Sequence, residues 1–299
     1  MEKCALKATE GELIRMEIEF LGTGGAITIP RPLCNCKVCL EARDKGVPYS
    51  RMGPSIFVHG PNLLIDTPED IYHQINRSTI DGIKGIIYSH WHPDHVMGRR
   101  VIESLSADWI NHPPLNKKLD IFLPEQVEKD FKTFLGSGDH LDFFELQGFA
   151  NLKKLKDGES FSLNGTKISP FRLAEDYVYA FMLECENKRV LIAMDELNNW
   201  NPDKTVSDVD LAILPVGIFE FHPLTGERLM PKDHTVFNEE ATFPETLEVV
   251  KVLKAKRVLL THIEEPNGLS FSDLKELETK LKESGINVEF AHDTQIVKV

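Results

Sequence analysis

The chain has 299 residues, of which 41% are hydrophobic and 27% are charged, a composition typical of an ordinary soluble globule with one or two domains. Its longest nearly apolar stretch, residues 211–219, has nine residues and includes a proline and a glycine. A membrane-spanning helix needs about 20 apolar residues. The formal charge of −13, from 34 basic and 47 acidic residues, disfavours a long footprint on nucleic acid, because such binding neutralises phosphates with Lys and Arg.

The first thirty residues contain many charges, so no signal-peptide core is present and we expect a soluble, cytoplasmic protein. Residues 1–14 follow no hydrophobic period and are predicted to form an N-terminal tail. No low-complexity run or linker divides the remainder, which predicts a single domain over residues 15–299.

Short strands are predicted along much of the chain. Residues 16–20 alternate between apolar side chains and glutamate, and they lead into the glycine turn of residues 22–25. Residues 55–59 and 63–65 flank Gly-Pro-Asn, a hairpin pattern. Further buried strands are predicted at residues 86–88, 190–194, 211–214 and 258–260. Three of these runs lead to His or Asp, at the strand ends where layered α/β folds gather their binding sites.

Two helices are predicted late in the chain. One covers residues 242–254 with Pro244 in its first turn, and the other follows a capping box of Ser270 and Asp273. The pattern is poorest between residues 103 and 156, where we expect a strand at 119–123, a helix and an insertion that could roof a cavity.

The segment Ser-His-Trp-His-Pro-Asp-His at residues 89–95 places four strong metal ligands within six residues. On an extended strand end His90 and His92 point the same way, because side chains repeat every two residues. The chain then turns at a proline, and Asp94 and His95 come from the start of the next helix. This turn can therefore hold two imidazoles toward one ion and a carboxylate with an imidazole toward a neighbouring ion.

Cysteines form a second candidate metal site. Cys34, Cys36 and Cys39 lie within six residues, and the total of five cysteines is odd. This spacing favours metal binding over a disulfide framework.

The strand, H-x-H-x-D-H and helix resemble the metallo-β-lactamase superfamily over residues 15–299. The resemblance implies an α/β fold, the four-layer αββα sandwich built from two similar halves, for this predicted hydrolase domain. Asp66 resembles the buried aspartate that orients the metal-binding turn, Asp195 the carboxylate that bridges two metals, and His262 the last histidine ligand. The resemblance implies a first ion on His90 and His92, and a second ion on Asp94, His95 and His262.

One branch of the superfamily fits best, the phosphonate-pathway phosphodiesterase that opens phosphoribosyl cyclic phosphates. In that branch C-x-C-x-x-C holds a structural zinc, whose fourth ligand is a histidine three residues after the last active-site histidine. Glu265 occupies that position here. Glu265 would then complete the zinc site, although a water or another histidine could do so instead.

Besides Glu265, a second difference from the superfamily pattern concerns the ligands of the first ion. The superfamily supplies another histidine before residues 181–184, where this chain has Ala174, Glu175 and Asp176. Either Glu175 or Asp176 replaces the imidazole, or the first ion is held weakly. We hypothesise that Glu175 is the ligand, which would shift metal preference from zinc toward manganese or iron.

His222 and His234 precede the penultimate helix, where the phosphodiesterase branch places a histidine that faces the substrate phosphate. We expect both to bind substrate, and His234 to stabilise phosphoryl oxygens or protonate the leaving alkoxide, an effect of roughly 10²–10⁴-fold. Asp94 is the other expected catalytic residue, through its ion.

The sequence therefore predicts a metal-dependent hydrolase with two divalent ions, most simply a phosphodiesterase acting on small cyclic or diester phosphates through a metal-bridging hydroxide. Three alternatives stay open: a tRNA 3′-processing nuclease, a lactonase-type hydrolase, and a non-catalytic binding protein like a relative in quinone-cofactor biosynthesis. The expected partner is a small phosphate ester, and a homodimer is an open alternative. We expect neither a membrane nor a nucleic-acid polymer as partner.

Overall fold

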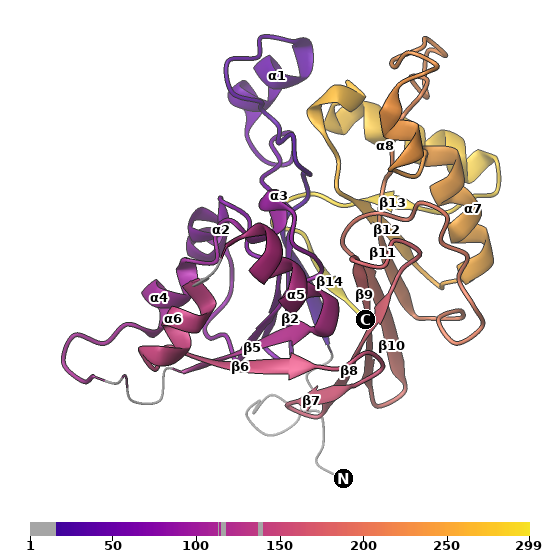
Figure 1. Ribbon diagram of the computed structural model, residues 1–299. Coiled ribbons are helices and arrows are strands. Elements are labelled where there is room, and N and C mark those ends of the chain that lie inside the picture. The colour runs from indigo at the N-terminus through magenta and orange to yellow at the C-terminus, as the bar shows by residue number, and fades with distance from the viewer. Residues whose placement is uncertain (1–15, 113, 115–117, 137–139) are drawn as a thin grey trace, which may run out of the picture.

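The computed structural model describes residues 16–112, 114, 118–136 and 140–299 (Figure 1). The predicted tail over residues 1–14 lies outside the described residues. None of the helices in the described part of the chain combines the length and apolar character needed to cross a bilayer.

The strands of the described residues form two sheets of seven strands each. The first sheet has the order β14-β1-β2-β3-β4-β5-β6, with β1 at Glu17–Gly22, β2 at Ser55–His59, β3 at Leu63–Ile65, β4 at Gly85–Ile87, β5 at Leu119–Pro124, β6 at Ala150–Leu155 and β14 at Ile296–Lys298. The second has the order β13-β12-β11-β10-β9-β8-β7, with β7 at Phe161–Leu163, β8 at Thr166–Arg172, β9 at Tyr179–Cys185, β10 at Lys188–Ala193, β11 at Leu211–Pro215, β12 at Val258–Thr261 and β13 at Glu289–Phe290.

The two sheets share one pairing pattern. In the first, β14, β1, β2 and β3 pair antiparallel, and β3 to β6 pair parallel. In the second, β7 to β10 pair antiparallel, and β10 to β13 pair parallel. The chain is therefore built from two similar halves, and the predicted α/β architecture is confirmed.

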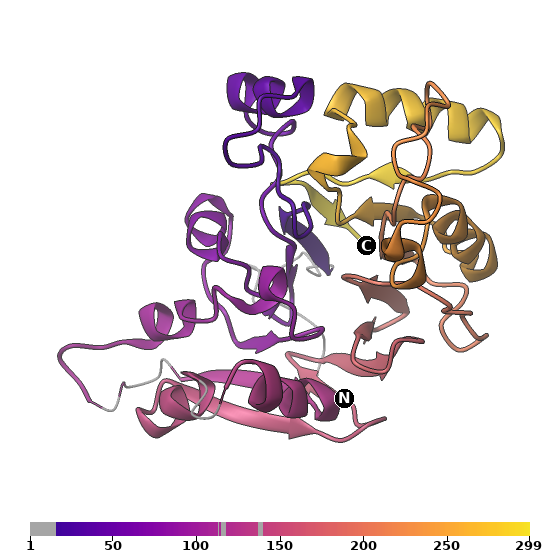
Figure 2. The same ribbon diagram turned by 45° about the horizontal axis from the view of Figure 1, so that its top comes forward.

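Helices cover the outer faces of the two sheets, as the two views of the ribbon show (Figures 1 and 2). The helices that follow strands of the first sheet are α2 (Ile71–Arg77), α3 (Pro93–Val96), α4 (Val101–Ser106), α5 (Glu125–Phe134) and α6 (His140–Leu146). Those beside the second sheet are α7 (Phe243–Leu253) and α8 (Phe271–Glu283), with 3-10 turns η1 (Thr235–Asn238) and η2 (Glu265–Asn267) before them. The helix α1 (Lys37–Lys45) lies apart, at the end of an extension of the first half.

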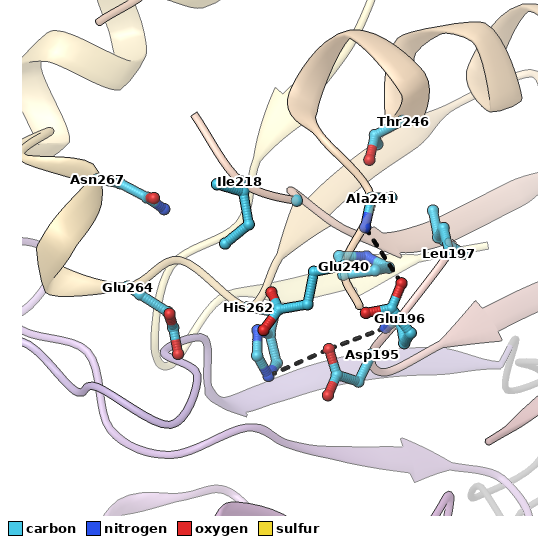
Figure 3. A pocket seen from close by; sticks show the side chains of 12 residues that line it. Asp195, Glu196, Leu197, Ile218, Glu240, Ala241, Thr246, His262, Glu264 and Asn267 are labelled. Atoms are coloured by element: carbon cyan, nitrogen blue, oxygen red, sulfur yellow. Dashed lines mark hydrogen bonds and ion pairs between the residues drawn. The ribbon is translucent and has the colours of Figure 1, made fainter. Parts of the chain in front are cut away.

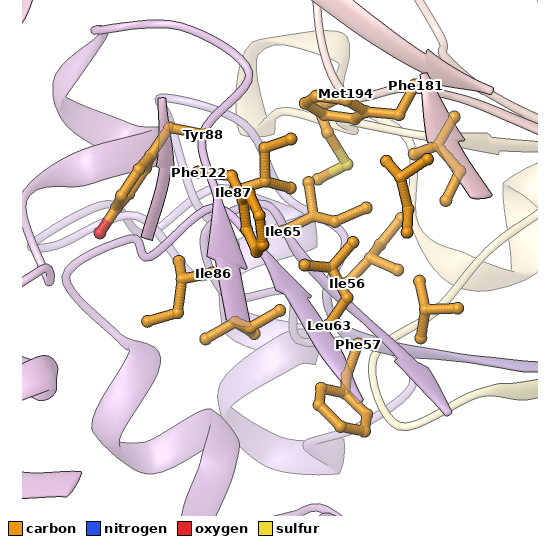
Figure 4. Close-up of a cluster of buried hydrophobic side chains, with 14 of the residues drawn as sticks. Ile56, Phe57, Leu63, Ile65, Ile86, Ile87, Tyr88, Phe122, Phe181 and Met194 are labelled. Carbon is orange, nitrogen blue, oxygen red and sulfur yellow. The ribbon is translucent and has the colours of Figure 1, made fainter. Parts of the chain in front are cut away.

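A continuous apolar core joins the layers. Phe181 and Met194 of the second half pack among Ile56, Ile65 and Ile87 of the first (Figure 4), and all five are buried. A second cluster fills the space between the second sheet and α7 and α8. The core therefore holds the ends of β3, β4, β10 and β12 in fixed relation to one another.

Local sequence signals account for many element ends. The hairpin between β2 and β3 has positive φ at Gly60 and Asn62, 105° and 54°, which suits these residue types. A capping box of Thr242 and Glu245 starts α7, and the predicted box of Ser270 and Asp273 starts α8.

The structure adds elements that the sequence pattern did not predict. β7, β8 and β9 form an antiparallel meander, and β8 contains Pro170 in its interior, which weakens its strand signal. The predicted cysteine segment continues into α1, whose N-cap is Cys36, with Sγ accepting from the Cys39 backbone N–H. In the poorly patterned region, the predicted strand is β5, and the helices α5 and α6 lead to β6.

Replacing Phe181 by alanine should lower the free energy of unfolding by about 3–5 kcal/mol, because a fully buried ring between the sheets leaves a cavity. Phe143→Ala, at a side chain that is 48% exposed, is the matched control and should cost far less. Chemical denaturation measures both values, and equal losses would contradict this placement of the core.

Candidate metal centre

The turn after β4 carries four of the predicted ligands. His90 follows β4, His92 is the N-cap of α3, and Asp94 and His95 lie in the first turn of that helix, with Pro93 as its first residue. The rings of His90 and His92 have centroids 4.5 Å apart, and those of His90 and His95 4.1 Å apart. One short segment thus gathers three imidazoles and a carboxylate.

The second sheet brings two further predicted ligands to the same place. Asp195 follows β10, and His262 follows β12 with a positive φ of 59°. The Nε2 atom of His262 lies 3.5 Å from Asp195 Oδ1 and 3.5 Å from Asp94 Oδ2. Strand ends from the two halves therefore meet, although the residues are far apart in the chain.

The ligand atoms form two adjacent groups. In each group all atoms lie within 4.8 Å of one another; the first group is His90, His92 and Asp195, and the second is Asp94, His95 and His262. Asp195 faces both groups, since its Oδ2 lies 3.4 Å from His90 Nε2 and 3.7 Å from His95 Nε2. This is the placement expected of a carboxylate that bridges two ions.

The spacing of these atoms suits a shared cation better than direct hydrogen bonds. Two ligands each about 2.0–2.1 Å from one ion, at a tetrahedral angle, lie about 3.4 Å apart. His90, His95 and His262 have buried Nε2 atoms with no hydrogen-bond partner, and each points at a carboxylate 3.4–3.5 Å away. The donor set and its orphaned nitrogens therefore fit divalent ions.

Asp66 holds the turn of residues 89–95 in position through hydrogen bonds. It follows β3, is fully buried, and accepts hydrogen bonds from Ser89 N at 2.7 Å and Ser89 Oγ at 2.6 Å. Its Oδ2 also lies 2.7 Å from His95 Nδ1. When Nδ1 of His95 donates to this carboxylate, the lone pair of Nε2 is left to face the second ligand group.

The electrostatics of the first group favour the ligand forms of His92 and Asp195. Burial and the neighbouring His90 lower the pKa of His92 to about 4, so that this imidazole is neutral at pH 7. Burial raises the pKa of Asp195, but the adjacent His262 and His90 outweigh it and hold the pKa well below its usual range. Neutral imidazole and ionised carboxylate are the forms that bind metal ions.

Glu175 is not a member of either ligand group among the described residues. It is half-buried in the loop between β8 and β9, next to the exposed Asp176. The side chain of this loop that lies against the first group is Tyr177, whose ring centroid is 5.5 Å from that of His92 and 6.1 Å from that of His90. The assignment of Glu175 as a ligand stays a prediction.

Three glutamates that the sequence analysis did not single out lie beside the second group. Glu196, Glu240 and Glu264 line a pocket together with Asp195 and His262 (Figure 3). Burial, reinforced by Asp195, raises the pKa of Glu196 to about 8 and that of Glu240 to about 7. The sequence pointed to two of them only by position, because Glu196 and Glu264 lie within two residues of predicted ligands.

The glycine turn after β1 forms part of the wall, as expected for a turn that shapes a cavity. A Cβ atom at Gly25 would lie 2.4 Å from the His262 ring and 2.7 Å from Glu264 Oε1. Glycine at this position therefore allows the chain to approach the site closely.

The cysteine segment contacts Glu265, the residue that the resemblance to the phosphodiesterase branch indicated as its fourth ligand. Glu265 Oε1 lies 3.2 Å from Cys34 Sγ and 3.1 Å from Cys36 Sγ, and with Cys39 these side chains form a third group within 4.8 Å. Backbone N–H groups also point at sulfur, including that of Arg31 toward Cys39 Sγ at 3.2 Å. Three thiols and a carboxylate are a chemically permitted zinc set, and the backbone donors would stabilise thiolates.

His222 and His234 are not part of the ligand groups. Both lie in the segment between β11 and α7, and their Nδ1 atoms accept backbone N–H groups: His222 from Leu224, and His234 from Val236. His234 is exposed and is the N-cap of η1. Their predicted roles toward substrate stay predictions.

Known proteins agree with this architecture. The model of the beta-lactamase superfamily domain matches residues 61–263. A ribonuclease Z of Archaeoglobus fulgidus is 24% identical over 230 residues, which cover 74% of this chain and 61% of that protein. The chain thus spans less than two thirds of the length of that relative.

Solved structures share the fold. A diphosphatase of the PhnP family superposes with a TM-score of 0.68 at 22% identity, covering 95% of this chain and 98% of that one. Zinc-bound PqqB from Methylobacterium extorquens superposes with a TM-score of 0.67 at 13% identity, covering 95% and 100% of the two chains.

Replacing Cys36 by serine should lower the zinc content by about one ion per chain, because the cysteine group then has too few soft ligands for a closed zinc site. Glu265→Gln should weaken zinc binding at the same site, and Glu276→Gln, on the surface of α8, is its matched control. Mass spectrometry of bound metal measures both. Unchanged affinity in Glu265→Gln would show that another group closes the site.

Proposed function

The chain belongs to the beta-lactamase superfamily, and from that premise we propose that it is a dinuclear metal-dependent hydrolase acting on small phosphodiesters. The observation that carries this proposal is the position of Asp195 between the two groups of ligand atoms. A single carboxylate that faces both groups is suited to hold two divalent ions close together.

Members of this superfamily typically bind two divalent metal ions. Here His90, His92 and Asp195 would hold one ion, and Asp94, His95 and His262 would hold the other. Bound ions of this kind lower the pKa of a water toward about 7 and neutralise charge on phosphoryl oxygens. An acidic protein can thereby accept an anionic substrate.

The reaction consumes one water for each phosphodiester. A bond forms between phosphorus and the water oxygen, the bond from phosphorus to the leaving oxygen breaks, and the water proton passes to the leaving alkoxide. Asp66 would not bind an ion itself. It orients the ligands, since it accepts a hydrogen bond from the Ser89 backbone and favours the His95 tautomer with a proton on Nδ1. The products are a phosphate monoester and an alcohol.

The substrate class rests on the PhnP-family likeness together with the cysteine group. The superposition at a TM-score of 0.68 covers nearly all of both chains, and the cysteine spacing resembles that of the phosphodiesterase branch. These two features support a small cyclic or diester phosphate. Zinc and manganese are the proposed ions at the active site, with iron as a further candidate, and zinc at the cysteine site.

A tRNA 3′-processing nuclease is the second candidate, because the ribonuclease Z likeness extends over 230 residues. The net charge of −13 opposes it, since RNA docking depends on cationic contacts with phosphates. Both candidates use the same bond chemistry, so a substrate panel separates them. The panel consists of bis(p-nitrophenyl) phosphate, a tRNA precursor with a 3′ trailer, and simple lactones, each with Zn²⁺ and with Mn²⁺.

Replacing His92 by alanine should lower kcat/KM for bis(p-nitrophenyl) phosphate by about a hundredfold or more, because the first ion loses a ligand. His73→Ala, on the exposed surface of α2, is the matched control and should retain activity. Hydrolysis is followed by p-nitrophenolate release. Full activity in His92→Ala, or cleavage of tRNA alone, would reject the proposal.

Glu175→Ala should lower the metal content at the first ion if Glu175 supplies the missing ligand, since a carboxylate there would move onto the ion when metal binds. Asp176→Ala is the comparison variant in the same loop, because Asp176 is the other candidate ligand. Metal analysis after dialysis against limiting Mn²⁺ gives the comparison. Equal metal content in wild-type and Glu175→Ala protein would remove Glu175 from the ligand set, and a loss confined to Asp176→Ala would transfer the role to Asp176.

A further inference from the structure

A small acidic pocket, with an internal volume of about 10 Å³, adjoins the second ligand group. Asp195 and His262 form one side of it, and the carboxylates of Glu196, Glu240 and Glu264 gather around them (Figure 3). The described residues that line the pocket include neither lysine nor arginine. The proposed ions therefore lie beside a wall of acidic side chains in which no lysine or arginine of the described residues offers a counter-charge.

Two of the glutamates are held in place by backbone donors. Glu264 Oε1 accepts the N–H of Ile27 at 3.1 Å, and Glu196 Oε1 accepts the N–H of Ala241 at 3.2 Å. In contrast, the Glu240 carboxylate is partly exposed to solvent, and its oxygens are not among the buried, unpartnered atoms of the described residues. Glu240 is therefore an acidic group of this pocket whose oxygens stay accessible to a donor from outside the chain.

A buried hydroxyl also faces this pocket without a partner. Thr246, in α7, has an exposed fraction of 0%, and its Oγ1 atom makes no hydrogen bond. The oxygen points toward the pocket in Figure 3, and it lies 3.0 Å from the position that a Cβ atom of Gly217 would occupy. A buried oxygen of this kind indicates a polar ligand group that can approach it.

The arrangement excludes several occupants. The three glutamates are not among the groups of described residues whose ligand atoms lie within 4.8 Å of one another, so the pocket does not form a third ion site of that kind. A phosphoryl group would be repelled by the carboxylates. The lining contains no phenylalanine, tyrosine or tryptophan among the described residues, so a quaternary ammonium would lack its usual cage. A primary ammonium meets every requirement, with three N–H donors and a positive charge.

We infer that the pocket binds a primary ammonium group of the substrate, so that the natural substrate is a zwitterionic aminoalkyl phosphodiester. This inference rests on the proposed hydrolase function and specifies the substrate of the same site. The phosphoryl group would lie at the ions, and the ammonium would donate to Glu240, Glu264 and Thr246. Specificity then comes from the pocket, and bond cleavage from the metal centre.

Four p-nitrophenyl phosphodiesters test the inference, because they share one leaving group and differ only in the second alcohol: ethyl, 2-hydroxyethyl, 2-aminoethyl and choline. With metal-loaded enzyme, kcat/KM for the 2-aminoethyl ester should exceed that for the ethyl ester by about 10–100-fold, as charge-assisted hydrogen bonds predict. The choline ester, which has charge but no N–H donor, should fall well below the 2-aminoethyl ester. Equal or greater preference for the hydroxyethyl ester would overturn the assignment of charge.

The variant Glu240→Gln should bring the ratio of the 2-aminoethyl to the ethyl ester toward one, whereas Glu239→Gln, at the exposed neighbour, should keep the wild-type ratio. Calorimetric titration with phosphoethanolamine and with ethyl phosphate gives a readout independent of turnover, and the former should bind at least tenfold more tightly. Hydrolysis of all four esters at one rate would reject this inference and leave the proposed function standing. If none of the esters is hydrolysed, the proposed function itself is rejected. The difference in affinity between phosphoethanolamine and ethyl phosphate would then still test whether the pocket binds an ammonium group.

Discussion

The buried carboxylate of Asp66 is the constraint on which the first half of the site depends. It accepts the backbone N–H and the hydroxyl of Ser89 and contacts His95 Nδ1, so it links the end of β3 to the turn after β4. The turn contains only a few residues, and besides these hydrogen bonds it is held by Trp91, which stacks on Phe134 with ring centroids 4.1 Å apart. A fully buried charge is tolerated here because several donors surround it, and their loss would leave an unpaired charge in the core.

The second half of the site depends on packing over long distances in sequence. Asp195 and His262 reach the turn because β10 and β12 lie in a sheet that packs on the first through a shared apolar core. Gly25 lets the chain after β1 pass against His262. The segment after His262 then continues to Glu264 and Glu265, so the acidic pocket and the cysteine group are tied to the same few residues. A change at the cysteine group can therefore reach the second ligand group through four residues of chain.

Sequence patterns predicted the features that depend on short spacing. The hairpin of β2 and β3, the capping box of α8 and the turn of His90 to His95 are each encoded within about ten residues, and the structure contains all three. The pocket glutamates could not be predicted in this way, because Glu196, Glu240 and Glu264 come from segments joined only by tertiary packing. His234 illustrates a local competition: its position before a helix is equally suited to capping, and in the structure its ring caps η1.

Charge connects the overall composition with the site. Two divalent ions would bring four positive charges to a centre whose Asp94 and Asp195 supply two negative ones, so the centre itself attracts a phosphodiester. A short distance away the lining is acidic, since Glu240 and Glu264 line a pocket to which the described residues contribute no lysine or arginine. A ligand with one sign of charge would be attracted at one end of the site and repelled at the other. A ligand with both signs, separated by a short linker, is stabilised at each end, and the acidic composition of the chain then serves selection of the substrate as well as its solubility.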